Sequence, residues 1–399
     1  MVTIRNYYVF SDFMTHMDDS KREFGSGISR RELLALAGIS GVTALTGCAS
    51  AETTATNPSV GSPSPLPVPE TGDIPQPSGP PGNLTVLDWA GFDSAVSYTF
   101  DDGQPSQLEH YNELRKTGIN STFYISINVD FSGYEEGWQQ VAADGHEIGN
   151  HTVSHPYADL TGSSFGEPLN STAAEIKQCT EYITQTFEQQ DVWTMAAPFG
   201  DTGWIEPAKQ ADVFLNRGVG GGTIAPNDST NPFDLPCYTA SDGDTAETFD
   251  DLADSSHSNG EWLIYLFHSI APTDAEWYAP VGISEITENI NHVKSLDNVW
   301  IDTVATIGAY WLGQKILDST TPTRAGSDKV WTWTLPDGFP QGQYLRVKTD
   351  GGILKQEGEA LEWDPHGYYE ISLDAGRLTL SPSSAGPPRR CNRRYDHDR

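Results

Sequence analysis

Stretches of apolar residues with the length of β-strands alternate with segments of helical periodicity through most of this chain. The strand-like runs are 95–100, 121–127, 192–197, 218–224, 262–267 and 299–304. We expect helices between them, one opened by a capping box at 172–175 and two more at 284–296 and 306–316. Alternation of this kind predicts an α/β fold, in which helices cover the outside of a parallel sheet. In an open barrel built this way, the active site lies at the carboxyl ends of the strands.

The pattern changes after residue 318. Short alternating strands now lie between Gly, Pro and Asp turns, in the stretches 329–334, 343–349, 351–354, 367–373 and 377–380. We therefore predict an α/β domain at 84–318, a small all-β appendage at 319–385 and a disordered basic tail at 386–399. Trp331 and Trp333 could stack on sugars, but we favour packing in the core of the appendage.

The start of the chain resembles an export signal. Arg30 and Arg31 precede a mildly apolar run at 35–45, and Leu45-Thr-Gly-Cys48 then resembles a lipobox. We predict a twin-arginine signal with a lipobox at 1–48, lipidation at Cys48, and a Pro/Ser/Thr-rich tether at 49–83. The apolar run is too short for a comfortable membrane span, and a short buried helix is the alternative. The expected location is outside the cell, on the outer membrane face through the lipid anchor or free, after twin-arginine export.

The charge of the chain is strongly acidic. With 23 Lys and Arg against 55 Asp and Glu, the formal net charge is −32, and the carboxylates are spread throughout. Such a chain repels nucleic acid, which we exclude as a partner. High salt would screen the repulsion among the carboxylates. The composition is similar to that of secreted haloarchaeal proteins.

The cysteine count leaves one thiol unpaired. If Cys48 is lipidated, three of the four cysteines remain, and an odd number cannot all pair within the chain. Cys179 lies on an apolar helix face, which favours a buried free thiol. A bridge between Cys179 and Cys237 stays open as the alternative.

Side chains that can carry chemistry follow three of the strand-like runs. Asp101 and Asp102 come directly after the first run, the turn at 198–200 follows the third, and His268 follows the fifth. If the runs are parallel strands, these groups meet at one edge of the sheet.

Two histidines add a metal-binding pattern. His151 and His155 are four residues apart, which predicts both imidazoles on one face of a helical turn. Together with a carboxylate they form a mixed nitrogen and oxygen ligand set that suits Zn²⁺ or another divalent metal, with one position open for water. Each signal is weak alone, because Asp-Asp-Gly is often a solvated turn and paired histidines occur on surfaces.

In this order, Thr99-Phe-Asp-Asp-Gly103 and His151-Thr-Val-Ser-His155-Pro resemble the first two motifs of the polysaccharide deacetylases, the NodB homology domain of carbohydrate esterase family 4. The resemblance implies a distorted (β/α) barrel, often with seven strands. It also implies that Asp102, His151 and His155 hold a divalent metal, Zn²⁺ first, with Co²⁺, Ni²⁺ or Mn²⁺ as alternatives.

The resemblance extends to the acid and the base. Asp101 matches the family's general base. Leu266-Phe-His268-Ser matches the last motif, in which His268 would protonate the leaving nitrogen and Leu266 would face the substrate. The third motif departs from the pattern, because Ala196 stands where many members have arginine. The backbone N–H near Phe199 could still stabilise an oxyanion.

Arg217 is a candidate replacement for the missing arginine. It precedes a glycine-rich run near the expected barrel mouth, where its guanidinium could hold the carboxylate of Asp101. The alternative is a surface salt bridge.

Three functions fit these residues. The first is metal-dependent removal of N-acetyl groups from amino sugars of a surface or extracellular polysaccharide or glycan. The second is O-acetyl ester hydrolysis on the same fold. The third is an inactive carbohydrate-binding lipoprotein, which the complete set of acid, base and metal-ligand residues argues against.

Overall fold

The computed structural model describes residues 66–70, 72–129, 134–187, 189, 191–273 and 278–383. The predicted export signal with Cys48, about half of the predicted tether, Cys391 and the predicted tail at 386–399 lie outside these residues. Within the described part of the chain, no helix has the length and apolar character needed to cross a membrane.

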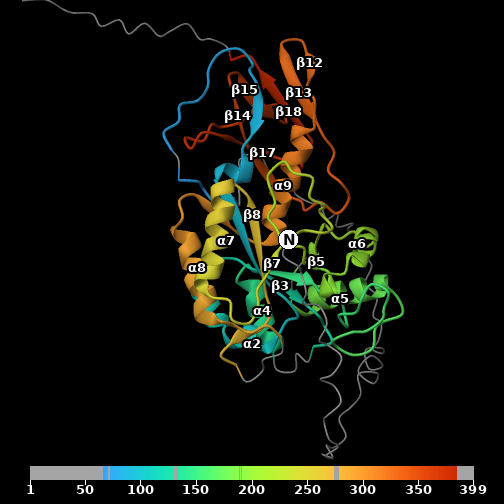
Figure 1. Cartoon of the computed structure of the whole chain (residues 1–399). Helices are drawn as coiled ribbons and strands as arrows, with labels where there is room; N and C mark the ends of the chain where they lie inside the picture. The colour runs from blue at the N-terminus through green and yellow to red at the C-terminus, as the bar shows by residue number, and fades with distance from the viewer. Residues whose placement is uncertain are drawn as a thin grey trace, which may run out of the picture. The chain divides into compact units, whose positions relative to one another are not determined.

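A parallel sheet of eight strands forms the centre of the α/β region (Figure 1). Seven strands follow the order β6-β5-β4-β3-β2-β8-β7, and β11 pairs with the first half of β2. Their bounds are β2 Ser94–Phe100, β3 Thr122–Ile125, β4 Glu147–Asn150, β5 Thr194–Ala196, β6 Leu215–Arg217, β7 Tyr238–Thr239, β8 Trp262–Phe267 and β11 Val299–Ile301. Arg217 at the end of β6 also forms a parallel bridge with Leu235, on the segment that leads into β7. The sheet therefore curls round on itself, which confirms the predicted distorted barrel.

Helices cover the outside of this sheet. They are α2 Pro105–Glu109, α3 Tyr111–Lys116, α4 Glu135–Ala143, α5 Thr172–Thr186, α6 Ile205–Gln210, α7 Ala246–Asn259, α8 Ile283–Ser295 and α9 Val304–Asp318. Side chains of β8 alternate between two cores, as the period of a strand requires. Leu263, Tyr265 and Phe267 pack outward with residues of α7 and α8, whereas Ile264 and Leu266 belong to the inner cluster.

Three of the sheet's strands, β6, β4 and β7, differ from the sequence expectation, and the two-residue strand β7 was not predicted. The run at 218–224 was predicted to be a strand, but β6 ends at Arg217, because the glycines that follow offer no side chains to pack. The strand β4 was not predicted, since its polar residues hide a fully buried segment. A Cβ at Gly149 of β4 would lie 2.5 Å from the ring of Tyr124, so the close approach of these strands depends on glycine.

The C-terminal region consists of two antiparallel sheets, as expected. One has the order β1-β14-β17 and the other β12-β13-β18-β15-β16. Their bounds are β1 Leu84–Val86, β12 Thr323–Ala325, β13 Asp328–Thr332, β14 Tyr344–Thr349, β15 Ile353–Gln356, β16 Glu359–Ala360, β17 Tyr369–Ser372 and β18 Arg377–Ser381. Trp331 and Trp333 are buried in the core, which confirms the favoured interpretation of these two residues.

One apolar core joins these sheets to the barrel through side chains of α9. A Cβ at Gly313 of α9 would lie 2.5 Å from the side chain of Leu373, which follows β17. The buried Arg346 of β14 donates to the carbonyls of Pro67 and Ala90, so part of the predicted tether contacts this region. The limits of separate domains stay a prediction.

Cysteines and surface charge complete the comparison with the sequence. Cys179 and Cys237 are buried free thiols, as the favoured interpretation predicted.

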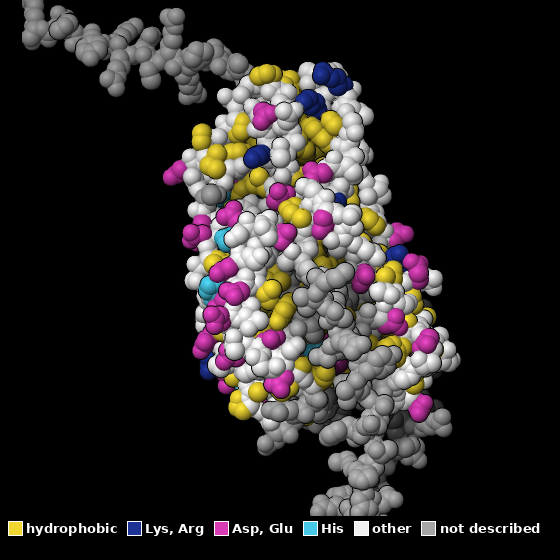
Figure 2. Space-filling model, viewed as in Figure 1, with side chains coloured by type: hydrophobic (Ala, Val, Ile, Leu, Met, Phe, Trp, Pro, Cys, Tyr) yellow, Lys and Arg dark blue, Asp and Glu magenta, His cyan; other side chains and the backbone are white. Residues whose placement is uncertain are grey.

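Figure 2 shows Asp and Glu side chains scattered over the viewed face, with few Lys and Arg between them. The acidic charge is therefore distributed over this surface and does not form a single patch.

Candidate active site

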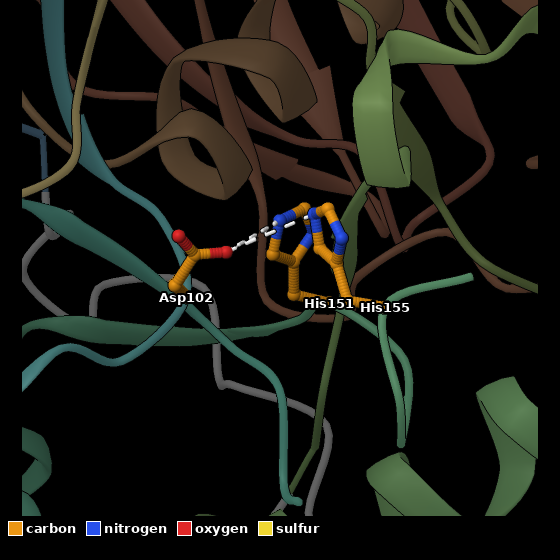
Figure 3. Close-up of side chains that lie close together, drawn as sticks. All are labelled: Asp102, His151 and His155. Atoms are coloured by element: carbon orange, nitrogen blue, oxygen red, sulfur yellow. Dashed lines mark ion pairs between the residues drawn. The ribbon is translucent and has the colours of Figure 1, made fainter. Parts of the chain in front are cut away.

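Asp102, His151 and His155 converge at the carboxyl ends of the sheet strands (Figure 3). Asp102 follows β2 and His151 follows β4, and one ligand atom from each of the three residues lies within 4.8 Å of the others. Asp102 Oδ1 is 3.5 Å from His151 Nε2 and 3.7 Å from His155 Nε2. The structure thus brings together the three residues that the sequence singled out as metal ligands.

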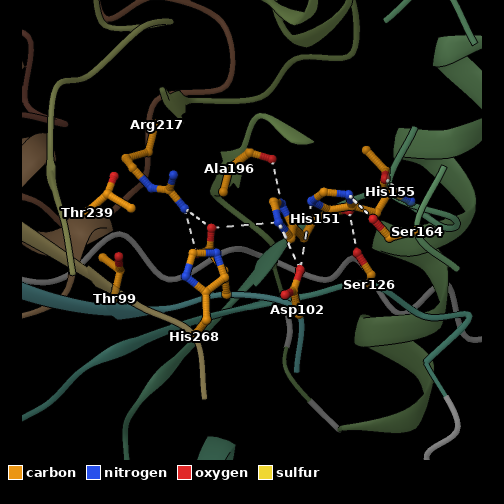
Figure 4. A network of polar contacts seen from close by, with 12 residues as sticks. Thr99, Asp102, Ser126, His151, His155, Ser164, Ala196, Arg217, Thr239 and His268 are labelled. Atoms are coloured by element: carbon orange, nitrogen blue, oxygen red, sulfur yellow. Dashed lines mark hydrogen bonds and ion pairs between the residues drawn. The ribbon is translucent and has the colours of Figure 1, made fainter. Parts of the chain in front are cut away.

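Hydrogen bonds on the far side of each imidazole show which nitrogen faces the centre. His151 Nδ1 lies 2.9 Å from the carbonyl oxygen of Ala196, and His155 Nδ1 lies 3.1 Å from the hydroxyl of Ser164 (Figure 4). A carbonyl oxygen only accepts, so Nδ1 of His151 carries the proton and Nε2 presents a lone pair. Burial lowers the pKa of both imidazoles to about 4, so both are neutral at pH 7.

This arrangement fits a divalent metal. The Nε2 atoms of both neutral imidazoles lie 3.5 and 3.7 Å from the same carboxylate oxygen, which is longer than a good hydrogen bond. A cation at the centre would satisfy all three ligand atoms, and the set of two nitrogens and one oxygen suits Zn²⁺ and its neighbours.

The histidines do not lie on a helical turn, which corrects the sequence prediction. The chain between them is a loop in which Thr152 and His155 have φ values of 68° and 54°, in the left-handed region. Side chains within the loop support this path, because Asn150 accepts from the N–H of Thr152 at 2.8 Å and Thr152 accepts from the N–H of His155 at 3.0 Å.

A buried carboxylate from α5 holds the same loop. Glu175 accepts from the backbone N–H of Val153 at 2.8 Å and from the N–H and hydroxyl of Ser154 at 2.9 and 2.8 Å. It also accepts from the N–H of Leu169 at 2.7 Å. Four donors thus converge on one carboxylate, which fixes the segment between His151 and His155.

The predicted capping box at 172–175 is therefore wrong. Ser171 is the N-cap of α5, and its hydroxyl accepts from the N–H of Ala174 at 3.1 Å. Glu175 reaches away from the helix start because the loop donors satisfy its oxygens. The sequence pattern located the helix correctly and gave its glutamate the wrong partner.

Asp101 and Arg217 form a buried ion pair beside the candidate metal site. Nη2 of Arg217 donates to Oδ1 of Asp101 at 2.5 Å and also contacts Oδ2, while Nη1 donates to the carbonyl of Gly218 at 3.1 Å. One nitrogen therefore spans both oxygens, and the second binds the backbone. Burial acts to raise the pKa of Asp101, but the charge of Arg217 outweighs it and holds that pKa below its usual value.

The sheet register explains how Arg217 can stand in for the arginine missing at Ala196. Ala196 ends β5, Arg217 ends β6, and the two residues are register partners in adjacent parallel strands. The guanidinium thus enters the site from the neighbouring strand. Oδ2 of Asp101 lies 3.6 Å from His151 Nε2, so the pair borders the candidate metal site directly.

His268 and Leu266 lie at the end of β8 and differ in exposure. The ring of His268 meets the ring of Tyr278 edge to face at a centroid distance of 4.7 Å. Its buried Nδ1 has no hydrogen-bond partner among the described residues. Leu266 is buried in the inner core cluster.

Phe199 lies at the rim of the site. It has a φ of 57°, is 43% exposed, and stacks on Tyr157 at a centroid distance of 4.2 Å. Its ring also meets His155 edge to face at 4.4 Å. Both aromatic rings line an open hollow of about 700 Å³, together with Asp159 and Asp201.

Buried amides near the site were not found from the sequence. Gln107 donates to the carbonyl of Asp101 at 2.6 Å and to that of His268 at 3.0 Å, so it ties the ends of β2 and β8 together. Gln104 contacts Asp102 itself. No sequence signal separates a buried glutamine of this kind from a solvated one.

Residues 91–211 match the family model described as Polysaccharide deacetylase. Over these residues the chain is similar to the polysaccharide deacetylases. The match covers Asp101, Asp102, His151, His155 and Phe199. Arg217, Leu266 and His268 lie beyond its end, on later strands of the same barrel.

Several solved structures of deacetylases and esterases are similar to the chain. One is the family 4 acetyl xylan esterase from Clostridium thermocellum, in complex with a cobalt ion, at 18% identity and a TM-score of 0.36, covering 55% of this chain and 92% of the other. A peptidoglycan deacetylase from Bacillus subtilis has 17% identity, a TM-score of 0.36 and coverages of 56% and 93%. The carbohydrate esterase domain of a multidomain xylanase from the hindgut metagenome of Trinervitermes trinervoides has 16% identity, a TM-score of 0.37 and coverages of 54% and 89%.

Proposed function

We propose that this protein is a metal-dependent hydrolase that removes N-acetyl groups from amino sugars of a surface or extracellular polysaccharide or glycan. The observation that carries the proposal is the convergence of Asp102, His151 and His155 beside a buried, ionised Asp101. A set of metal ligands next to an ionised carboxylate that does not belong to the set can supply the activated water and the general base for hydrolysis of an amide.

Asp102, His151 and His155 would hold the metal, for which Zn²⁺ is the first choice. When bound, such a cation acidifies water and polarises the carbonyl oxygen of an acetyl group. Asp101 would then accept the proton of the attacking water. Arg217 keeps Asp101 ionised and fixes its orientation, both of which a general base needs.

The remaining groups would act on the other side of the acetyl carbon. His268, at the end of β8, would donate a proton to the leaving nitrogen. The backbone N–H of Phe199 would donate to the oxyanion, and Leu266 would border the acetyl methyl group. The turn that contains Phe199 is closed by backbone hydrogen bonds in which the N–H groups of Gly200 and Asp201 are the donors.

Acetate release from defined oligosaccharides tests this proposal. Wild-type protein should release acetate from N-acetylated glucosamine oligomers faster than from O-acetylated xylan oligomers, and a chelator should abolish the release. Asp101→Asn preserves the size of the side chain and should retain metal while losing turnover. Faster release from the O-acetylated substrate would favour the esterase, and no release from either would leave the binding lipoprotein.

We further propose that the chain is exported by the twin-arginine machinery and tethered to the membrane through Cys48. The supporting observations are Arg30 and Arg31, the following apolar run and the lipobox at 45–48. Cys48→Ser should release the protein from membranes or block its processing. Wild-type protein found soluble in the cytoplasm would refute this location.

A further inference from the structure

The carboxylate of Asp102 is held on both of its oxygens. Oδ1 faces His151 Nε2 and His155 Nε2 at 3.5 and 3.7 Å. Oδ2 accepts a hydrogen bond from the amide nitrogen of Gln104 at 2.9 Å. Gln104 is fully buried, so water does not compete for this bond. Its amide therefore determines which oxygen of Asp102 is left for the metal.

The amide of Gln104 is fixed in turn by the segment that follows β8. Its oxygen accepts from the hydroxyl of Ser269, and that hydroxyl accepts from the backbone N–H of Tyr278 at 3.3 Å. A second bond runs from the N–H of Ser269 to the carbonyl of Tyr278 at 3.2 Å. Ser269 is the residue directly after His268. The hydrogen bonds through Gln104 therefore connect Asp102 to the segment that bears the proposed acid.

Only one direction of donors satisfies this series of bonds. A carboxylate accepts, so the NH₂ of Gln104 must face Asp102 and its oxygen must face Ser269. The hydroxyl of Ser269 then donates to Gln104 and accepts from the N–H of Tyr278. A flipped amide would oppose two oxygens at the Asp102 end, which a buried site penalises.

We propose that Gln104, oriented by Ser269, is a positioning residue that aims Oδ1 of Asp102 at the metal. The inference rests on the proposed function, since it assumes that Asp102, His151 and His155 bind a divalent cation. Partners that orient a ligating group commonly change metal affinity by about 10- to 100-fold when they are removed. Loss of the amide should therefore weaken metal binding and leave the three ligands in place.

Zinc affinity tests the proposal without an activity assay. Gln104→Met keeps the length of the side chain and removes both hydrogen bonds. After removal of metal, a competition titration of Zn²⁺ against a chromophoric chelator should give a Kd about 10- to 100-fold weaker than that of the wild type. Ser269→Ala should weaken binding less, and the double variant should bind no worse than Gln104→Met, because the two residues act in series.

Gln314→Met is the matched control. Gln314 is also fully buried and donates to an aspartate, Asp88, but from α9 and away from the trio. This variant should lose stability and keep the wild-type Kd for zinc. Equal Kd values for Gln104→Met and wild type would overturn the proposal, as would an equal weakening in Gln314→Met. If Gln104→Met does not fold, Ser269→Ala with unchanged Kd has the same force.

The outcomes also separate this inference from the proposed function. Wild-type protein that binds no zinc would contradict both. Wild-type protein that binds zinc, with Asp102→Ala losing it and Gln104→Met unchanged, would contradict the positioning role alone.

Discussion

The buried pair of Asp101 and Arg217 should make a large contribution to folding, which can be measured separately from catalysis. Arg217 is 1% exposed and Asp101 is 3% exposed, so solvent and salt screen their interaction little. Arg217→Met keeps much of the side-chain volume and leaves Asp101 without a partner. Breaking a buried pair in this way costs about 3–5 kcal/mol, and we expect Arg217→Met to lower the free energy of unfolding by that amount.

A double-mutant cycle isolates the pair. Asp101→Asn leaves Arg217 without its counter-charge and should cost a similar amount, whereas the double variant has no uncompensated charge. We therefore expect the double variant to be more stable than either single variant, because removing both charges of a buried pair is often neutral. Urea unfolding of the metal-free proteins at pH 7 in high salt measures all four free energies.

Arg346 and Glu370 provide the control cycle. Arg346 is as buried as Arg217, but the side chain of Glu370 is 27% exposed and three backbone carbonyls also accept from Arg346. The coupling between Arg346 and Glu370 should therefore be smaller. Additive costs for Asp101→Asn and Arg217→Met would refute the reasoning, because they would mean that the two charges do not depend on each other.

The free energy of unfolding should also depend on pH through the pair of Asp101 and Arg217. In the wild type the pKa of Asp101 is lowered, so the pair stabilises the fold above the unfolded carboxyl pKa of about 3.9, and this stability is lost as the pH falls through the folded value. In Arg217→Met, burial acts without the opposing guanidinium and raises that pKa. The stability difference between wild type and variant should thus widen as the pH rises above about 4.

Turnover should respond as well. Arg217→Lys replaces the planar guanidinium by a single ammonium nitrogen, which cannot occupy the positions of both Nη2 at Asp101 and Nη1 at the carbonyl of Gly218, so kcat should fall while zinc content stays normal.

Three further predictions concern the loop, the histidines and the surface. Glu175→Gln cannot accept from all four donors, so it should cost about 1–3 kcal/mol of unfolding free energy and weaken zinc binding; unchanged urea midpoints would contradict this. The metal-free protein should lose stability as the pH falls from about 6.5 to about 4, because burial lowers the pKa of His146, His151 and His155 to about 4, and a flat profile of unfolding free energy against pH would argue otherwise. With a net charge of −32, the fold should melt at a lower temperature when molar salt is dialysed away, and melts that ignore salt would remove the halophilic interpretation.

The sequence was sufficient to predict the parts of the fold that rest on local pattern. The unbroken apolar run of β8 and the short C-terminal strands were located to within a few residues. The strand β4 was missed because a glutamate in the sequence suggests a surface or turn position, whereas Glu147 is buried within the strand. Its oxygens accept from the hydroxyls of Thr122 and Thr194. These partners lie on other strands, so the pattern of polar and apolar residues along the sequence does not reveal them.

The candidate site was predictable in its residues more than in its geometry. Spacing suggested a helical turn for His151 and His155, but the actual loop depends on Glu175, which comes from a helix farther along the chain. Arg217 could be proposed from its place near a strand end. Its strand β6 pairs directly with β5, which ends at Ala196. This pairing follows from the order of the strands in the sheet, and that order cannot be read from the sequence.

The most direct test of the account is reconstitution of the metal-free protein with zinc. Acetate release should rise in proportion to added Zn²⁺ and reach its limit at about one equivalent per chain, because three protein ligands with one open position describe a single catalytic metal. Asp102→Ala, His151→Ala and His155→Ala should each bind little zinc and release little acetate at any zinc concentration. Full acetate release by the metal-free wild type, or by any of these three variants, would contradict the central claim.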